Sequence, residues 1–406
     1  MSSRLDDVFA RTRELFDLPE GLVYLDGNSL GPLPRAVRDR IARVVDAEWG
    51  RQLIKGWNES AWIDLPRAVG DRVAALVGAP AGSVIAGDST SVNLFKVLSS
   101  AVAIQAEDRP GRRVVLSDSG NFPTDLYVMQ GLVRALGGGW EVRVVAPEAV
   151  AEAIDPSVAV LALTQVDYRT GRLHDMQDLT ARAHAAGALA VWDLAHSAGA
   201  LPVELESAGA DFAVGCGYKY LNGGPGAPAY LYVAAAHADR ALPALAGWMG
   251  HEAPFAFDTD YRPAPGLDRM LVGTPPILSM AALHEALAVW EGVDLADVRA
   301  RSIELSERFI AGVEASCPEL ELASPRDPLA RGSQVSLRFE HGYSAMQALI
   351  ANDVVGDFRA PDLMRFGFTP LYVGPDDIDR AVEVLARVMR ERLWDREEYR
   401  RRAKVT

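Results

Sequence analysis

Short apolar runs alternate with longer amphipathic segments through the middle of the chain. The runs have the length and composition of buried strands and fall at residues 113–118, 142–146, 158–164, 188–193, 211–216 and 227–233. Between them lie stretches with helical spacing, such as DMQDLTARAHAAG, which opens on an acidic residue and closes on a glycine. Strands that alternate with helices are typical of α/β units, so the pattern predicts a large domain with a mainly parallel sheet.

This rhythm stops at residues 254–276, which are rich in proline and glycine. A helix-rich stretch follows, and then the pattern predicts a strand at 332–340 and a helix after Ser344. A long charged helix is predicted from about Asp376 to Lys404. Helices and strands that are not regularly interleaved favour a smaller α+β domain at the C-terminal end.

We therefore expect three parts in the chain. Residues 1–50 form an N-terminal segment that packs with the small domain, residues 51–280 form the large domain, and residues 281–406 form the small domain. A chain of 406 residues is long enough for more than one core.

Composition and charge narrow the range of partners. With 49% hydrophobic and 24% charged residues the chain resembles ordinary soluble proteins, and its net charge of -14 argues against general binding to nucleic acid or anionic membranes. The two cysteines, Cys216 and Cys317, exclude a disulfide framework and a multi-cysteine metal site. No secretory leader or membrane-spanning run is recognisable, so we predict a cytoplasmic protein.

Three polar clusters follow predicted strands. The run ALAVWD ends on Asp193, with His196 shortly after it; Asp167 follows VAVLALTQ, and Lys219 follows DFAVGC. Open α/β sheets bind ligands beyond the carboxyl ends of their strands, which is where these side chains are expected.

Lysine is rare in this sequence. Only four of the 41 basic residues are lysines, namely Lys55, Lys96, Lys219 and Lys404. Lys219 lies in GYKYLNGGPG, and an amine can form an imine with an aldehyde whereas a guanidinium cannot. By itself, however, Lys219 has the pattern of a surface lysine on a turn.

An amine, a buried carboxylate and a phosphate cradle are what pyridoxal 5'-phosphate (PLP) needs from a protein. Lys219 and Asp193 supply the first two, and the hydroxyl-rich segment DSTSVN at 88–93 precedes a predicted helix whose N-terminal amides suit a phosphate. Taken singly, Asp193 has the pattern of a cap and His196 that of a structural histidine. Their combination at strand ends favours PLP binding.

Eight blocks in the same order carry a resemblance to a known family. They are YLDGNSLGPLP, DSTSVNLFK, NFPTDLY, WDLAHSAGALPV, GCGYKYLNGGPG, GWMGHE, GTPPIL and RFGFTPLY. The combination, which spans about residues 20–390, resembles the kynureninase family of fold-type I PLP enzymes, within the aminotransferase class V-like superfamily. The resemblance implies a seven-stranded sheet and hydrolysis of the Cβ–Cγ bond of L-kynurenine to anthranilate and L-alanine in the kynurenine pathway, with 3-hydroxykynurenine as a second possible substrate.

The resemblance also implies roles for individual residues. Lys219 would bind PLP covalently and remove the α-proton, Asp193 would pair with the ring nitrogen, and Tyr218 would be a proton donor, a phosphate ligand or both. The remaining cofactor contacts implied are Thr90, Ser91, Phe122, Pro123, Thr124, Asp125, Asp167, His196, Trp248 and Thr274.

For the substrate, the resemblance implies that Arg365 clamps the α-carboxylate, since a planar fork suits a carboxylate. Trp57, Gly273 and Thr274 match positions that line the aryl pocket. The segment that carries Thr274 would come from the neighbouring subunit, which implies a homodimer with active sites at the subunit interface.

Four other readings remain open. A cysteine desulfurase needs a mobile cysteine, and both cysteines fit buried positions better. An aminotransferase shares the early chemistry but needs no aryl pocket, and a non-catalytic PLP-binding protein would keep the cofactor without forming product. A nicotinamide-dependent dehydrogenase is disfavoured, because the glycines of LNGGPGAP precede a strand instead of joining a strand to a helix.

Overall fold

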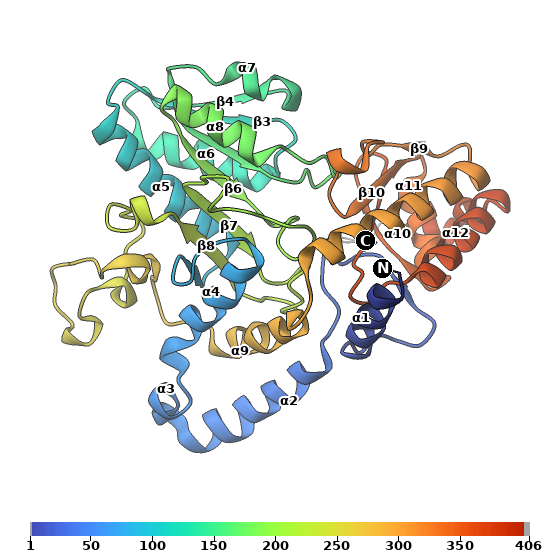
Figure 1. Ribbon diagram of the computed structural model, residues 1–406, viewed down its shortest axis with the longest axis horizontal. Coiled ribbons are helices and arrows are strands. Elements are labelled where there is room, and N and C mark those ends of the chain that lie inside the picture. The colour runs from blue at the N-terminus through green and yellow to red at the C-terminus, as the bar shows by residue number, and fades with distance from the viewer. Residues whose placement is uncertain (1, 402–406) are drawn as a thin grey trace.

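A computed structural model describes residues 2–401 (Figure 1). Its largest sheet has seven strands in the order β2-β8-β7-β6-β5-β3-β4, and β8 alone runs against its two neighbours. The strands are β2 (Val84–Ala86), β3 (Val114–Asp118), β4 (Glu141–Val145), β5 (Val158–Thr164), β6 (Leu189–Asp193), β7 (Phe212–Cys216) and β8 (Ala229–Val233). The predicted mainly parallel sheet of seven strands is confirmed. The apolar runs all form strands, and only the three-residue β2 lacks a predicted counterpart.

Helices cover both faces of this sheet because its strands alternate their side chains between two cores. Along β5, Val160 and Ala162 point to a core that also receives α5 and α6, whereas Leu161 and Leu163 point to the core that receives α4 and α8. The covering helices are α4 (Leu65–Leu76), α5 (Thr90–Asp108), α6 (Pro123–Leu136), α7 (Val150–Ala153), α8 (Met176–Ala186) and α9 (Ile277–Ala286).

A second sheet lies in the C-terminal part, on the right of Figure 1, with the antiparallel order β12-β13-β10-β9. Its strands are β9 (Glu321–Leu322), β10 (Gln334–Arg338), β12 (Asp357–Arg359) and β13 (Leu363–Gly367). The helices beside it are α10 (Leu295–Ser316), α11 (Gly342–Ile350) and α12 (Pro375–Arg390). The predicted strand at 332–340 and the helix near Ser344 are therefore present.

The N-terminal segment contacts the C-terminal part and also the large sheet's helices. Helix α1 (Ser2–Glu14) lies against residues near α12, where the Thr12 hydroxyl donates to the Leu371 carbonyl at 2.9 Å, and β1 (Val23–Tyr24) pairs with β11 (Val354–Val355). Helix α2 (Arg35–Arg43) packs on α9 instead. The exact limits of the three predicted parts, at residues 50 and 280, stay a prediction.

The predicted helix from Asp376 to Lys404 is wrong in its second half. Helix α12 ends at Arg390, Arg392 adopts a left-handed backbone with φ 51, and only the short α13 (Glu397–Arg400) follows; residues 402–406 lie outside the described chain. The turn places the Trp394 ring on His341, with centroids 4.6 Å apart and planes at 15°. Ring packing on α11 therefore outweighs the helical propensity of the charged residues.

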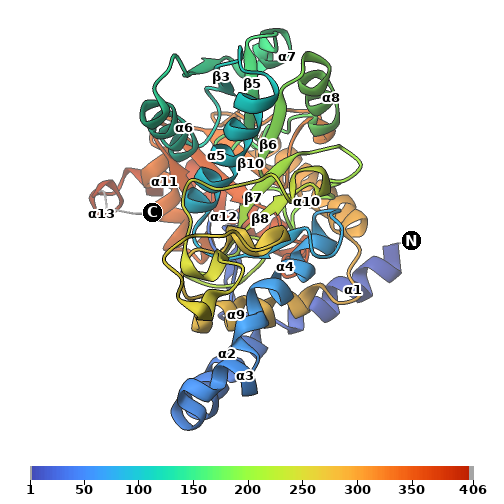
Figure 2. The same ribbon diagram turned by 90° about the vertical axis from the view of Figure 1, so that its left-hand side faces the viewer.

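Helix α2, a π-helical segment at Val44–Gln52 and α3 (Gly56–Glu59) form an arm that projects away from the rest of the molecule in both views (Figures 1 and 2). The arm exposes large apolar side chains, with Ile54 77% and Trp49 56% exposed. Isolated chains rarely leave such side chains together in water.

No helix in the described part of the chain combines the length and apolarity needed to cross a bilayer.

Candidate active site

The polar clusters predicted at strand ends meet at one edge of the large sheet. Asp193 is the last residue of β6, Asp167 follows β5, and Lys219 follows β7, and these three strands are direct neighbours. Because parallel strands end at the same edge, residues distant in sequence become adjacent. The ammonium of Lys219 lies 2.8 Å from Nε2 of His196.

His196 is a buried imidazole with one unmatched nitrogen. Burial lowers its pKa well below the ordinary value, and the nearby positive charges of Lys219 and Arg365 act in the same direction. A neutral His196 accepts from Lys219 at Nε2, so its proton is on Nδ1, which is buried and has no hydrogen-bond partner in the described chain. A buried donor without a partner is costly, and a bound polar group would satisfy it.

Asp125 and Asp193 form a buried carboxyl pair beside the lysine. Burial, followed by the adjacent Asp193, raises the pKa of Asp125 well above its usual range. Burial also raises the pKa of Asp193, although its Oδ1 accepts from the Ala195 N–H at 2.7 Å and Lys219 lies near. Of the two carboxyls, Asp125 therefore has the stronger tendency to carry a proton.

The segment predicted to bind phosphate forms the first turn of α5. Thr90 and Ser91 are half-buried there, and Ser89 caps the helix with its hydroxyl oxygen 3.4 Å from the Val92 nitrogen. Amides in a first turn have no intrahelical acceptors and carry the positive end of the helix dipole, so this turn can bind an anion.

Tyr218 stands next to the lysine and keeps its hydroxyl proton. Burial, followed by the charges of Cys216 and Asp193, raises its pKa above the ordinary value. The Lys219 ammonium lies 5.8 Å from the centroid of the Tyr218 ring. A neutral phenol in this place is a hydrogen-bond donor, which suits both roles considered for Tyr218.

The NFPTD segment presents an aromatic ring at the mouth of the site. Phe122 is 44% exposed and packs edge-on against Tyr168, with centroids 5.0 Å apart and planes at 85°. Pro123 and Thr124 begin α6, which directs Asp125 inward to the carboxyl pair. An aromatic ring with an exposed face can stack on a flat partner.

Asp167 has a local task in its own turn. Its Oδ1 accepts from the backbone amides of Arg169 and Thr170 at 2.7 and 2.8 Å. The carboxylate is buried at the site edge and its second oxygen lies against Gly120. Asp167 therefore shapes the border of the site, and its predicted contact with a ring stays a prediction.

Arg365 is less free than the predicted substrate clamp requires. Its side chain is 1% exposed, its Nε donates to Asp357 Oδ1 at 2.6 Å, and a second nitrogen reaches the other oxygen of the same carboxylate. The guanidinium also donates to the Ser29 hydroxyl at 3.1 Å and to the Tyr168 carbonyl. One edge of the fork is thus occupied by Asp357, and a carboxylate ligand would have to use the edge that faces Ser29 and Tyr168.

The residues predicted for the aryl pocket are not joined to Lys219 by any contact within the described chain. Trp57 packs edge-on against Trp62, with centroids 6.0 Å apart, while Gly273 and Thr274 are exposed. Trp248, predicted at the phosphate, is 40% exposed and lies against Phe255 at 5.7 Å.

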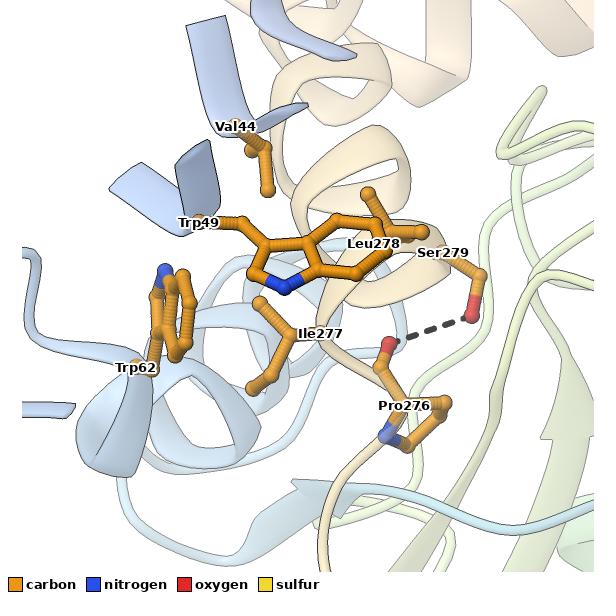
Figure 3. A pocket seen from close by; sticks show the side chains of 7 residues that line it. All are labelled: Val44, Trp49, Trp62, Pro276, Ile277, Leu278 and Ser279. Carbon is orange, nitrogen blue, oxygen red and sulfur yellow. Dashed lines mark hydrogen bonds between the residues drawn. The ribbon is translucent and has the colours of Figure 1, made fainter. Parts of the chain in front are cut away.

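An apolar cavity of about 450 Å³ lies between the arm and α9. Figure 3 shows the Trp49 ring between Val44 and Leu278, with Trp62 and Ile277 beneath it. The cavity is close to the segment that carries Thr274 but is lined by other residues. It identifies a second region, distinct from the buried edge around Lys219.

Sequence reasoning missed three interacting groups. It did not foresee the sharing of a proton by Asp125 and Asp193, the pairing of Arg365 with Asp357, or the buried Lys96, whose ammonium lies 2.8 Å from Asp88. The register of the hairpin formed by β12 and β13 would have revealed the second, because it places Asp357 opposite Arg365.

A lysine, a buried carboxyl pair and a helix N-terminus at the carboxyl edge of a mainly parallel sheet define the class of fold-type I PLP-dependent enzymes. Solved structures agree in fold: a cysteine desulfurase from Thermococcus onnurineus NA1 superposes with a TM-score of 0.79 at 18% identity, over 94% of this chain and 98% of that one. At this identity the likeness concerns the fold alone. Both cysteines of the present chain are buried and unpaired, as predicted.

Sequence relatives then determine the family. A kynureninase from Deinococcus radiodurans is 52% identical over 95% of this chain and 94% of its own length, and one from Pseudomonas fluorescens is 47% identical over 98% and 97%. The family profile described as the Kynureninase C-terminal domain matches residues 298–385. The chain belongs to the kynureninase family. The predicted family, fold class, enzyme class and PLP cofactor are thereby confirmed.

Proposed function

We propose that the site around Lys219 cleaves L-kynurenine hydrolytically to anthranilate and L-alanine. The observation that carries the proposal is the Lys219 ammonium, 2.8 Å from the buried His196 and beside the buried carboxyl pair of Asp125 and Asp193. An amine held among groups that can accept and return a proton suits chemistry at a carbon next to an amino group.

The residues at this edge fit PLP. Lys219 would hold the cofactor covalently, Asp193 would face the ring nitrogen, and Thr90 and Ser91 would take the phosphate at the first turn of α5. The unmatched Nδ1–H of His196 would gain an acceptor. When bound, the cofactor supplies an electron sink for the carbon atoms next to the substrate amine.

Lys219 would move the proton during the reaction. Its free amine would take the α-proton, and its mobile stem could carry that proton a short distance. Neutral His196 accepts a hydrogen bond from the same nitrogen and holds it in place. Asp193 would face the ring nitrogen and favour its protonated form, while Asp125, whose pKa is raised well above its usual range, would be the protonated member of the pair.

Tyr218 and Arg365 would act on the substrate's two ends. The protonated phenol of Tyr218 can donate to the ketone oxygen while water adds, or bind phosphate. Arg365 would orient the α-carboxylate through the guanidinium edge that now faces Ser29 and Tyr168. That edge keeps the bidentate geometry expected of arginine even with Asp357 on the other side.

The aryl end of the substrate would be enclosed by a second subunit. Trp248, Gly273 and Thr274 are exposed and Trp57 is half-buried, and none of them contacts a group around Lys219 within residues 2–401. The apolar arm beside them offers the surface for a homodimer. The preference between L-kynurenine and its 3-hydroxy form depends on this region. A cytoplasmic location completes the proposal, and cell fractionation measures it.

The test is to mix the purified chain and PLP with L-kynurenine and to measure anthranilate fluorescence and L-alanine. The proposal expects both products in equal amounts. A control with pyruvate as amino acceptor separates an aminotransferase, which would consume pyruvate without forming anthranilate. Cofactor colour without product from kynurenine or its 3-hydroxy form would identify a binding protein and contradict the proposal.

A further inference from the structure

A second lysine, Lys96, is buried without an assigned task. It lies in the second turn of α5 with 1% of its surface exposed. Its ammonium donates to Asp88 Oδ2 at 2.8 Å and to the backbone carbonyl of Met270 at 2.6 Å. Burying an ammonium is costly unless its partners are fixed, so these two contacts constrain both segments that supply them.

The first contact fixes the turn that precedes α5. Asp88 adopts the left-handed region with φ 50, which few residues other than glycine, asparagine and aspartate enter. Asn93, also from α5, donates from its side chain to the Gly87 carbonyl at 2.9 Å. Two side chains of one helix therefore hold the backbone that leads into Thr90 and Ser91.

The second contact fixes the start of the segment that leads to Thr274. Two residues after Met270 comes Val272, whose carbonyl oxygen would lie 2.1 Å from a Cβ at Gly247, so the two backbones are in direct contact. The Met249 amide donates to the same carbonyl at 3.4 Å. Through Met270 the lysine thus reaches the backbone on both sides of Trp248.

The geometry also explains why this position holds a lysine in a chain that favours arginine. An ammonium is compact and donates in three directions from one atom, which suits two acceptors that approach one buried point. A guanidinium is wider and planar and would have to displace the surrounding core. Burial lowers the pKa of Lys96, and the negative charge of Asp88 acts against this shift.

We propose that Lys96 is a positioning residue that holds the phosphate-binding turn and the segment leading to Thr274 in a fixed relation. The proposal rests on the proposed function for its assignment of phosphate to Thr90 and Ser91. Lys96 acts through Asp88 on the first segment and through Met270 on the second. Its loss should therefore weaken binding of the cofactor's phosphate and, separately, disturb the aryl side of the site.

The decisive variant is Lys96→Met, which keeps the length of the side chain and removes the charge. Dissociation constants for PLP and for pyridoxal, which has no phosphate, are measured by fluorescence titration of the cofactor-free protein. We expect PLP to bind about tenfold more weakly, as for loss of one charge-assisted hydrogen bond, and pyridoxal to change less than about twofold. An equal loss for both ligands, or no loss for either, would overturn the positioning role.

Asp88→Asn is the matched variant, because it weakens the first contact and leaves the Met270 contact intact. Asp88 has a side chain 31% exposed, and the asparagine oxygen can still accept a hydrogen bond from the buried Lys96, so the change removes the negative charge but not the acceptor. We expect it to reproduce the loss of PLP affinity while the KM for kynurenine, measured at saturating PLP, stays near that of the wild type. Lys96→Met should raise that KM. If Asp88→Asn binds PLP like the wild type, the proposed link to the phosphate turn is wrong.

The double variant Lys96→Met with Asp88→Asn removes both charges and serves where Lys96→Met alone fails to fold. The double variant should lose affinity for PLP but not for pyridoxal. If the ratio of the two dissociation constants is the same as in the wild type, the proposal is contradicted. Product formation by the wild type is scored separately. If the variants change the ratio of the dissociation constants but the wild type forms no anthranilate, the proposed substrate is wrong and the role of Lys96 stands. If the wild type forms anthranilate but the variants leave the ratio unchanged, the proposed role of Lys96 is wrong.

Discussion

The edge around Lys219 and the arm around Trp49 differ in which side chains they bury and which they expose. At the edge, the polar side chains of Asp125, Asp193 and His196 are buried beside Lys219. On the arm, apolar side chains such as Ile54 lie in water. The difference supports the proposal that a second subunit covers the arm and encloses the aryl side of the site.

The strongest test of the comparison removes the amine at the buried edge. Lys219→Ala should lower kcat by about 10⁴-fold or more, because proton transfer and covalent attachment are both lost. Lys219→Arg should be as inactive, since a guanidinium keeps the charge but forms no imine. Anthranilate formation and the mass of the borohydride-reduced holoenzyme measure the two effects. Substantial activity in either variant would contradict the assignment of Lys219.

A smaller effect is expected where the edge meets the small sheet. Asp357→Asn should raise the KM for kynurenine about tenfold with little change in kcat, because the guanidinium of Arg365 loses its charged anchor. The matched control is Asp362→Asn in the same hairpin, whose carboxylate pairs at 3.2 Å with the exposed Arg338. Steady-state kinetics decide, and an equal rise of KM in both variants would show a general effect on the hairpin.

The arm is tested by placing a charge on its exposed apolar surface. Ile54→Asp should weaken subunit association about tenfold, since an interface core tolerates an unpaired carboxylate poorly. Sedimentation at several concentrations measures this, and activity should recover as protein concentration rises. Leu329→Asp, at an equally apolar position that is 73% exposed in the C-terminal part, is the control. If both variants associate as strongly as the wild type, the arm is not part of the subunit interface.

The smallest effect concerns the shared proton of the carboxyl pair. The pKa of Asp125 is raised in the folded chain, so the stability that its proton contributes is present below the unfolded pKa and is lost as pH rises through the folded pKa. Asp125→Asn removes this loss. The cofactor-free variant should therefore melt higher than the wild type at pH 8, by a few degrees, and the gain should shrink toward pH 4. A gain that is independent of pH would contradict the shared proton.

Much of the fold was accessible from the sequence because its signals are local. Buried parallel strands need continuous apolar runs, and β3 to β8 each carry one. The three-residue β2 has too few positions for a pattern, and α12 ended early because Trp394 packs on His341, a contact between segments far apart in the chain. The same distinction holds for the site.

Residue type and order along the chain were enough to propose Lys219 and Asp193, because PLP needs an amine and a carboxylate and strand ends can be recognised in the sequence; the role of His196 came from the family resemblance. Which groups are charged was decided only by the tertiary structure. Burial and the approach of Asp125 to Asp193, of Asp357 to Arg365 and of Lys96 to Met270 join segments between 8 and 174 positions apart. Electrostatic energy depends on distance in space and on exclusion of water, and neither quantity is written in the order of residues.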